Sequence, residues 1–242
     1  LPHYHYLLRH MLKNLNLFSG TRNDALKNAA IWVAGSKIKF AGSFEALPEM
    51  PQGTVEKDLA GKFVMAGMTE THAHLSFADA SPFAIGETLV EEATLTAVRN
   101  ARLMLGSGFT SAVSFGSTYK IDVALRDAIS QGSVIGPRLL AAGRDLGATA
   151  SNVDSGGGLS QIADGPWALR KAVREQRKIG VDVVKIFIDG EAINKQNPPG
   201  ELSFTDEEVS AAVAEAHRRG MRVACHARSA AAVKQAVRAE VD

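Results

Sequence analysis

The first part of the chain alternates short apolar runs with turn-forming residues. Runs at residues 12–18, 29–35 and 37–42 have β-like patterns, and Gly, Ser and Asn residues separate them. This pattern predicts a small β unit. From Lys62 onward, strand-like runs alternate with longer stretches of helical spacing, which is typical of parallel βα units. We therefore expect a first domain of residues 1–61 and a second domain of residues 62–242.

The second domain contains five strand candidates, and a plausible helix follows each of them. They are residues 63–69, 110–115, 138–142, 182–188 and 222–225. Five βα units cannot close an eight-stranded barrel, so the pattern predicts an α/β fold that is an incomplete (β/α)8 TIM barrel. A doubly wound sheet is the alternative, but no Gly-x-Gly-x-x-Gly turn follows the first strand to indicate a dinucleotide site.

One helix is marked at both of its ends. Thr205 and Glu208 have the spacing of a capping box, and Gly220 suits the left-handed position after a last helical turn. Two long loops, residues 148–158 and 191–200, are rich in Gly, Asn and Pro and follow the third and fourth strands. Such loops carry substrate-binding segments in α/β folds, although a linker has a similar composition.

Composition narrows the class of protein. The 242 residues are 45% hydrophobic and 22% charged, which is ordinary for a globular chain and excludes disorder throughout. The formal net charge of +1 provides no overall field for nucleic acid, and the chain has no run of 18 apolar residues for a membrane. Cys225 is the only cysteine, so we expect a reducing compartment, the cytoplasm.

The N-terminal residues do not resemble a secretory signal. The chain begins with Leu1, and we expect Met11 to be the natural start, so that residues 1–10 come from expression or processing. His3 and His5 lie in this segment, where short histidine-bearing ends commonly bind metals adventitiously.

His72 and His74 form a His-x-His motif directly after an apolar run. Residues two apart share a face of a strand, so inside a parallel barrel both imidazoles would point toward its mouth. There they could bind one divalent cation, since imidazole suits Zn, Fe, Ni or Co. Two half-buried histidines that hydrogen-bond to the backbone are the structural alternative.

Lys185 lies within VDVVKIFI, a run that reads as a fully buried strand. An unpaired ammonium is costly to bury, so this lysine must be neutralised, paired or chemically converted. One such conversion is the capping of its amine by CO2 to form an anionic carbamate. A lysine that extends its amine to solvent from a strand end is the alternative.

His226 follows another predicted strand and is expected at the same end of the fold as the residues above. A single histidine at a strand end is structural more often than not, but ligand-type residues on three strand ends form a pattern. His217, in contrast, lies among polar residues of a helix and is expected to be a solvated surface residue.

Longer stretches of the sequence resemble the amidohydrolase superfamily, and in order they cover most of residues 11–242. The relevant branch contains Xaa-Pro dipeptidase-like, arginine carboxypeptidase-like and imidazolonepropionase-like enzymes, which combine a β-sandwich with a (β/α)8 barrel. Residues 1–61 would then be the N-terminal β-sandwich portion. The similar stretches are GKFVMAGMTETHAHL, LMLGSGFTSAVSFG, GPRLLAAG, DGPWALRKAVREQRKIGVDVVKIF and FTDEEVSAAVAEAHRRGMRVACHA.

The resemblance implies a catalytic centre of two divalent metal ions, with zinc as the default. His72 and His74 would bind one ion, His226 would bind the second, and carboxylated Lys185 would bridge them as a catalytic group. A metal-activated hydroxide would then attack the amide carbonyl. The chain departs from the family pattern where Glu70 replaces the usual Asp and Ala66 the usual Pro, which affects local support of the first strand rather than the metal ligands.

Related enzymes also use a histidine from the sixth strand and an aspartate from the eighth. This chain stops before both, so we expect the remaining C-terminal barrel segment to be required and the 242 residues alone to be inactive. Asp242 is terminal and is no substitute.

The expected function is hydrolysis of an amide-type C–N bond in a dipeptide, an N-acyl amino acid or a related small molecule. Arg144 and Arg228 follow strand ends and could hold a substrate carboxylate, although a structural ion pair is the more common role of such arginines. The alternatives are a non-catalytic metal-binding module and a cyclic amide hydrolase acting on an imidazolone or lactam. No nucleic-acid or membrane partner is expected, and a homo-oligomer is compatible with the sequence.

Overall fold

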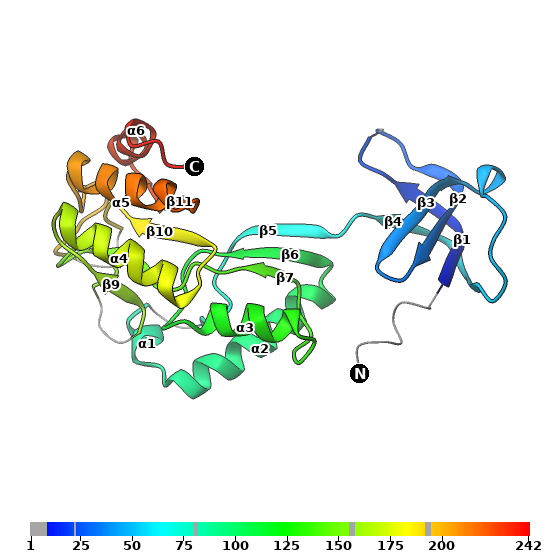
Figure 1. Ribbon diagram of the computed structural model, residues 1–242, viewed down its shortest axis with the longest axis horizontal. Coiled ribbons are helices and arrows are strands. Elements are labelled where there is room, and N and C mark those ends of the chain that lie inside the picture. Colours follow the sequence, from blue (N-terminus) through cyan, green and yellow to red (C-terminus); the bar gives the residue numbers. More distant parts are fainter. Residues whose placement is uncertain (1–8, 22, 80–81, 155–157, 192–194) are drawn as a thin grey trace. The chain divides into compact units, whose positions relative to one another are not determined.

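The computed structural model describes residues 9–21, 23–79, 82–154, 158–191 and 195–242 (Figure 1). Expectations about His3 and His5, and about residues 155–157 and 192–194 of the two long loops, fall outside these ranges. The chain divides into two compact units, Leu1–Gly67 and Met68–Asp242. The expected domain boundary after residue 61 therefore falls inside a strand of the first unit, Val55–Met65.

The N-terminal unit contains one four-stranded sheet with the order β3-β2-β1-β4. Strand β1 pairs antiparallel with β2 and parallel with β4, and the 3-10 turn η1 follows β3. Leu15, Ala29 and Ile31 form the buried core on one face of this sheet. The bounds are β1 (Arg9–Phe18), β2 (Leu26–Ala34), β3 (Lys37–Ser43), η1 (Phe44–Ala46) and β4 (Val55–Met65).

The expected first barrel strand, residues 63–69, is divided between the two units. Its first residues end β4, where Phe63 to Met65 pair with the end of β1. A separate strand, β5 (Met68–Ala73), begins after Gly67 and pairs with β6 (Phe109–Ser114). The prediction of one continuous strand was wrong because an apolar run looks the same whether it serves one sheet or two.

The first half of the C-terminal unit builds a parallel sheet with the order β5-β6-β7. Figure 1 shows these strands side by side, with α2 and α3 along one face. Ala93, Ala97 and Ala101 recur every fourth residue of α2 and are buried, so their small side chains let the helix approach the sheet closely. The remaining elements are α1 (Pro82–Glu87), α2 (Val90–Gly106), α3 (Ile121–Ser130) and β7 (Arg138–Leu140).

The second half builds a second parallel sheet, with the order β11-β10-β8-β9. Strand β10 is buried along its whole length, and a large apolar core joins it to the helices α4 and α5. The bounds are β8 (Asp145–Gly147), β9 (Ser160–Ile162), α4 (Pro166–Ile179), β10 (Val183–Phe187), α5 (Asp206–Arg218), β11 (Arg222–His226) and α6 (Ala230–Arg238).

The chain crosses from one sheet to the other between β7 and β8. Residues 138–142 were expected as one strand, but β7 ends at Leu140 and the short strand β8 joins β10 instead. The buried carboxylate of Asp122 stabilises the crossing by accepting hydrogen bonds from the backbone N–H groups of Ala142 and Gly143. The backbone of this segment is thus held by a side chain distant in sequence, which residue patterns did not predict.

The fold-class prediction is confirmed: the chain is a partial TIM-barrel-like α/β fold with an N-terminal strand-rich part. The capping box predicted for Thr205 and Glu208 is present at the start of α5. Among the helices that the structure describes, none combines the length and the apolar character needed to cross a membrane.

Candidate metal centre

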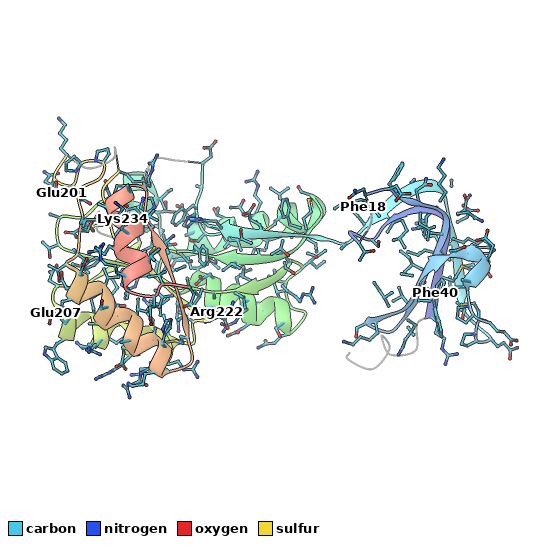
Figure 2. All side chains as sticks on the ribbon, turned by 90° about the horizontal axis from the view of Figure 1, so that it is seen from above. Phe18, Phe40, Glu201, Glu207, Arg222 and Lys234 are labelled. Atoms are coloured by element: carbon cyan, nitrogen blue, oxygen red, sulfur yellow. The ribbon has the colours of Figure 1, made fainter. Side chains whose placement is uncertain are left out.

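A cavity of about 310 Å³ lies in the C-terminal unit, and it is lined by residues in or just after β5, β10 and β11 and by the first residue of β8. Parallel strands bring their C-terminal ends to a common edge, which is where α/β folds place ligand sites. Figure 2 shows the two ends of these strands through two labelled residues. Arg222, at the start of β11, lies well away from Glu201, which is in the loop that follows the C-terminal end of β10. The ionisable residues that line the cavity are His72, His74, Asp145, Lys185, Glu191 and His226.

His72 and His74 lie together at the end of β5, with ring centroids 5.2 Å apart. Nδ1 of His74 is 3.0 Å from the carbonyl oxygen of Gly116, and its ring stacks on Phe77. Burial lowers the pKa of His74 to about 4 and also lowers the pKa of His72. Both imidazoles are therefore neutral near pH 7, which is the form that binds a metal ion.

Glu70 supports this pair through the backbone. Its carboxylate accepts a hydrogen bond of 3.0 Å from the backbone N–H of His72. Glu70 therefore holds the His-x-His segment by reaching two residues along the chain.

Lys185 is in the middle of β10 and is only 2% exposed. Its Nζ lies 5.2 Å from the centre of the Phe115 ring, which also makes a T-shaped contact with the ring of His72. Burial lowers the pKa of Lys185 because the ammonium loses its hydration, although Asp145 opposes this effect. The amine is therefore closer to the neutral, nucleophilic form than a surface lysine.

His226 is the last residue of β11, and its ring stacks on Phe187 at the end of β10, with centroids 3.9 Å apart. Its Nε2 is 3.0 Å from Oε1 of Glu191 and 3.9 Å from Oδ1 of Asp189. Burial lowers the pKa of His226, while Glu191 opposes the shift. The structure thus brings His72, His74, Lys185 and His226 to one cavity.

Asp145 is a cavity residue that sequence reasoning missed. It starts β8, is 5% exposed, and its Oδ1 has no hydrogen-bond partner within the described part of the chain. Burial raises the pKa of Asp145 to about 7, although Lys185 opposes the shift. Because β8 is only three residues long, no periodic pattern marked its start, and only the three-dimensional fold turns this carboxylate into the cavity.

Glu191 was also missed, although it begins one of the two loops expected to carry binding residues. A single acidic residue at a loop start is common, and nothing local distinguishes it from a solvated one. His217, expected on the surface, is exposed and lies 2.9 Å from a carboxylate oxygen of Asp242.

The two arginines expected to bind a carboxylate lie outside the cavity wall. Nη1 of Arg144 is 3.4 Å from the backbone carbonyl of Ser160, to which it donates a hydrogen bond. Arg228 has a mostly exposed side chain and donates a hydrogen bond of 3.2 Å to Glu191. Arg228 is therefore next to a cavity residue, whereas Arg144 contacts the backbone of the first residue of β9.

The donor set fits a divalent metal centre only if Lys185 contributes to it. Among residues 9–21, 23–79, 82–154, 158–191 and 195–242, no three His, Cys, Asp or Glu side chains form a group able to hold an ion. The cavity is lined by three neutral imidazoles, one buried amine and the carboxyl groups of Asp145 and Glu191. Conversion of that amine to an anionic oxygen ligand would supply the negative charge that the imidazoles lack.

Known proteins are similar to this chain in sequence and in fold. Residues 63–242 match the model of the Amidohydrolase family. Ochratoxinase from Aspergillus niger is 27% identical over 244 aligned residues, which cover 89% of this chain and 50% of the ochratoxinase. The chain thus spans about half the length of this curated relative.

Solved structures give the same result. The crystal structure of an amidohydrolase superposes with a TM-score of 0.88 and 28% identity, over 96% of this chain and 59% of that one. A Xaa-Pro dipeptidase with bound methionine in its active site superposes with a TM-score of 0.84 and 26% identity, over 97% of this chain and 60% of the dipeptidase. The family match covers most of this chain, and the chain therefore belongs to the amidohydrolase family.

Proposed function

We propose that the full-length protein is a metal-dependent hydrolase that cleaves an amide-type C–N bond in a dipeptide, an N-acyl amino acid or a related small molecule. The burial of Lys185 in the same cavity as three neutral histidines carries this proposal. A lysine placed there without a purpose would only destabilise the fold. Relatives named as ochratoxinase and Xaa-Pro dipeptidase support the choice of an amide-type bond.

The proposed metal ligands divide between the two sheets. His72 and His74 would hold one divalent ion, His226 would hold a second, and Lys185, carboxylated by CO2, would bridge the two. The lowered pKa of Lys185 favours its carboxylation, because only the neutral amine attacks CO2. Zinc is the default ion since it suits imidazole ligands. When bound, such ions polarise the scissile carbonyl and acidify water.

The rest of the cavity wall suits a small substrate with an apolar part. Phe77, Val153, Leu159 and Phe187 form its apolar side and would exclude water from the reacting bond. Asp145, with a pKa of about 7, is suited to exchange a proton in this cavity at neutral pH. These residues bind and orient a substrate without specifying which amide it contains.

The test uses the full-length protein, its Lys185→Ala variant, and Lys178→Ala as a control at an exposed lysine of α4. We expect about two divalent ions per chain by elemental analysis, with hydrolysis of a dipeptide panel. Lys185→Ala should lower the bound metal and reduce kcat/KM by about 100-fold or more, while Lys178→Ala should change neither.

Absence of bound metal, or full activity in Lys185→Ala, would refute the proposal. Bound metal without turnover of dipeptides, N-acyl amino acids or cyclic amides would instead indicate a non-catalytic metal-binding protein.

A further inference from the structure

The helix α2 lies at the outer margin of the C-terminal unit (Figure 1). Its three buried alanines mark the face that packs against the rest of the unit. An α-helix has about 3.6 residues per turn, so Leu95 lies on the opposite face, with Glu91 one turn before it and Arg99 one turn after it. All three side chains are exposed. The outer face of α2 is defined here as residues 91, 92, 95, 98, 99, 102 and 103.

The outer face of α2 has aliphatic side chains among its charged ones. Leu95 is 71% exposed and Leu103 is 54% exposed. A hollow of about 450 Å³ along the helix is lined by these two leucines, Val98 and two arginines. Single exposed leucines are common on protein surfaces, but a hollow lined by three aliphatic side chains can receive an apolar side chain from a facing helix. Covering this face would therefore remove apolar surface from water.

The charges of the outer face are separated along the helix. Glu91 and Glu92 are in the first turn, whereas Arg99 and Arg102 are in the second half of α2. None of the four makes an ion pair with another residue that the structure describes. Arg219 of α5, in contrast, is held 2.6 Å from a buried carboxylate. The helix dipole favours this order of charges, but it gives no reason for the exposed leucine between them.

This arrangement is complementary to itself. Leu95 is four residues from Glu91 and four residues from Arg99, which is about 6 Å along the helix axis in each direction. A two-fold axis through Leu95 would place a second α2 antiparallel to the first, with leucine against leucine and glutamate opposite arginine at both ends. A parallel arrangement would instead bring like charges together.

We propose that the outer face of α2 binds a second copy of this chain, with the two α2 helices antiparallel around Leu95. Glu91 of each copy then pairs with Arg99 of the other, in the self-complementary contact that two-fold symmetry requires. An acidic partner would match only the arginine end of this face, and a basic partner only the glutamate end. One helix per copy buries less than the roughly 1,200–2,000 Å² of a standard interface, so we expect a weak dimer.

The test measures self-association of the full-length protein by sedimentation equilibrium over a range of micromolar concentrations. Arg99→Glu and Glu91→Arg each bring like charges together at both ends of the contact, so each should weaken association about 10-fold or more. An equimolar mixture of the two variants should associate as strongly as the wild type, because opposite charges then meet at both ends.

Two further variants complete the test. Leu95→Lys places two ammonium groups at the axis and should also weaken association. Arg177→Glu, at an exposed arginine of α4, is the matched control and should leave association unchanged. Circular dichroism should show the same helix content in all variants, since the substituted side chains are exposed.

A wild type that stays monomeric, or unchanged association in both charge variants, would overturn the proposal. Equal weakening by Arg177→Glu would also overturn it, because the effect would then come from net charge. If the single variants lost association and their mixture did not recover it, the face would be covered by another segment or a different protein, and the proposal would again be wrong. None of these outcomes depends on the proposed hydrolase activity.

Discussion

Gly116 leaves the space that the carboxylate of Asp145 occupies. A Cβ on Gly116 would lie 2.6 Å from Oδ1 of Asp145, and the φ of Gly116 is +123°, in the region that other residues rarely adopt. The carbonyl oxygen of the same glycine lies 3.0 Å from Nδ1 of His74. One residue without a side chain thus accommodates a buried carboxylate and contacts a candidate ligand.

Gly116→Ala should therefore destabilise the protein and disturb the cavity. The backbone strain alone costs about 1–3 kcal/mol, and the displaced carboxylate adds to it. Gly132→Ala is the matched control, because Gly132 also has a positive φ but a Cβ there meets nothing within 4 Å. Urea unfolding should show a larger loss for Gly116→Ala, and equal losses would contradict the packing argument.

Asp145 should make stability depend on pH. Its pKa in the folded protein is about 7 against an ordinary value of 3.8, so between these values the folded state binds more protons than the unfolded state. The contribution of the protonated Asp145 carboxyl to the free energy of unfolding is therefore fully present below pH 3.8 and is lost as the pH rises through 7.

Asp145→Asn cannot ionise and should remove this dependence. At pH 8 the metal-free variant should exceed the wild type in its free energy of unfolding, by at most about 4 kcal/mol, and the gap should shrink toward pH 5. Urea denaturation at the two pH values measures this. If the difference in free energy of unfolding were the same at both pH values, the charge on Asp145 would not destabilise the folded protein.

Arg144 and Arg228 should differ in their effect on catalysis. Arg144 donates to the carbonyl of Ser160 away from the cavity, so Arg144→Gln should cost about 1 kcal/mol of stability with little change in KM. Arg228→Gln removes a partner of Glu191 and should lower kcat/KM by about tenfold. Steady-state hydrolysis by the full-length variants tests both, and a large rise of KM in Arg144→Gln would restore its expected role with a substrate carboxylate.

The capping box of α5 should contribute measurably to stability. The side chain of Thr205 accepts from the backbone N–H of Glu208, and the carboxylate of Glu208 accepts from the backbone N–H of Thr205. Thr205→Ala should lower the free energy of unfolding by about 0.5–2 kcal/mol. Thr94→Ala, within α2, is the control and should change it by less than about 0.5 kcal/mol. Similar losses in the two variants would argue against the cap.

Local sequence patterns determine the order of the βα units and identify the strands that carry His72, Lys185 and His226. The reason is physical: the C-terminal ends of parallel strands share one edge, so residues there meet even when they are far apart in the chain. The longer stretches that resemble amidohydrolases predicted the family and the fold, and the family match and the solved structures confirm both.

The tertiary structure decided what surrounds those residues. Only the paired strands show that one apolar run ends β4 and then begins β5, because hydrophobicity does not specify which sheet a residue joins. Only the tertiary fold shows that Asp145 and Glu191 line the cavity and that Arg144 lies outside it. These placements depend on contacts between residues distant in the chain, such as the carboxylate of Asp122 with the crossing after β7, and local patterns do not encode such contacts.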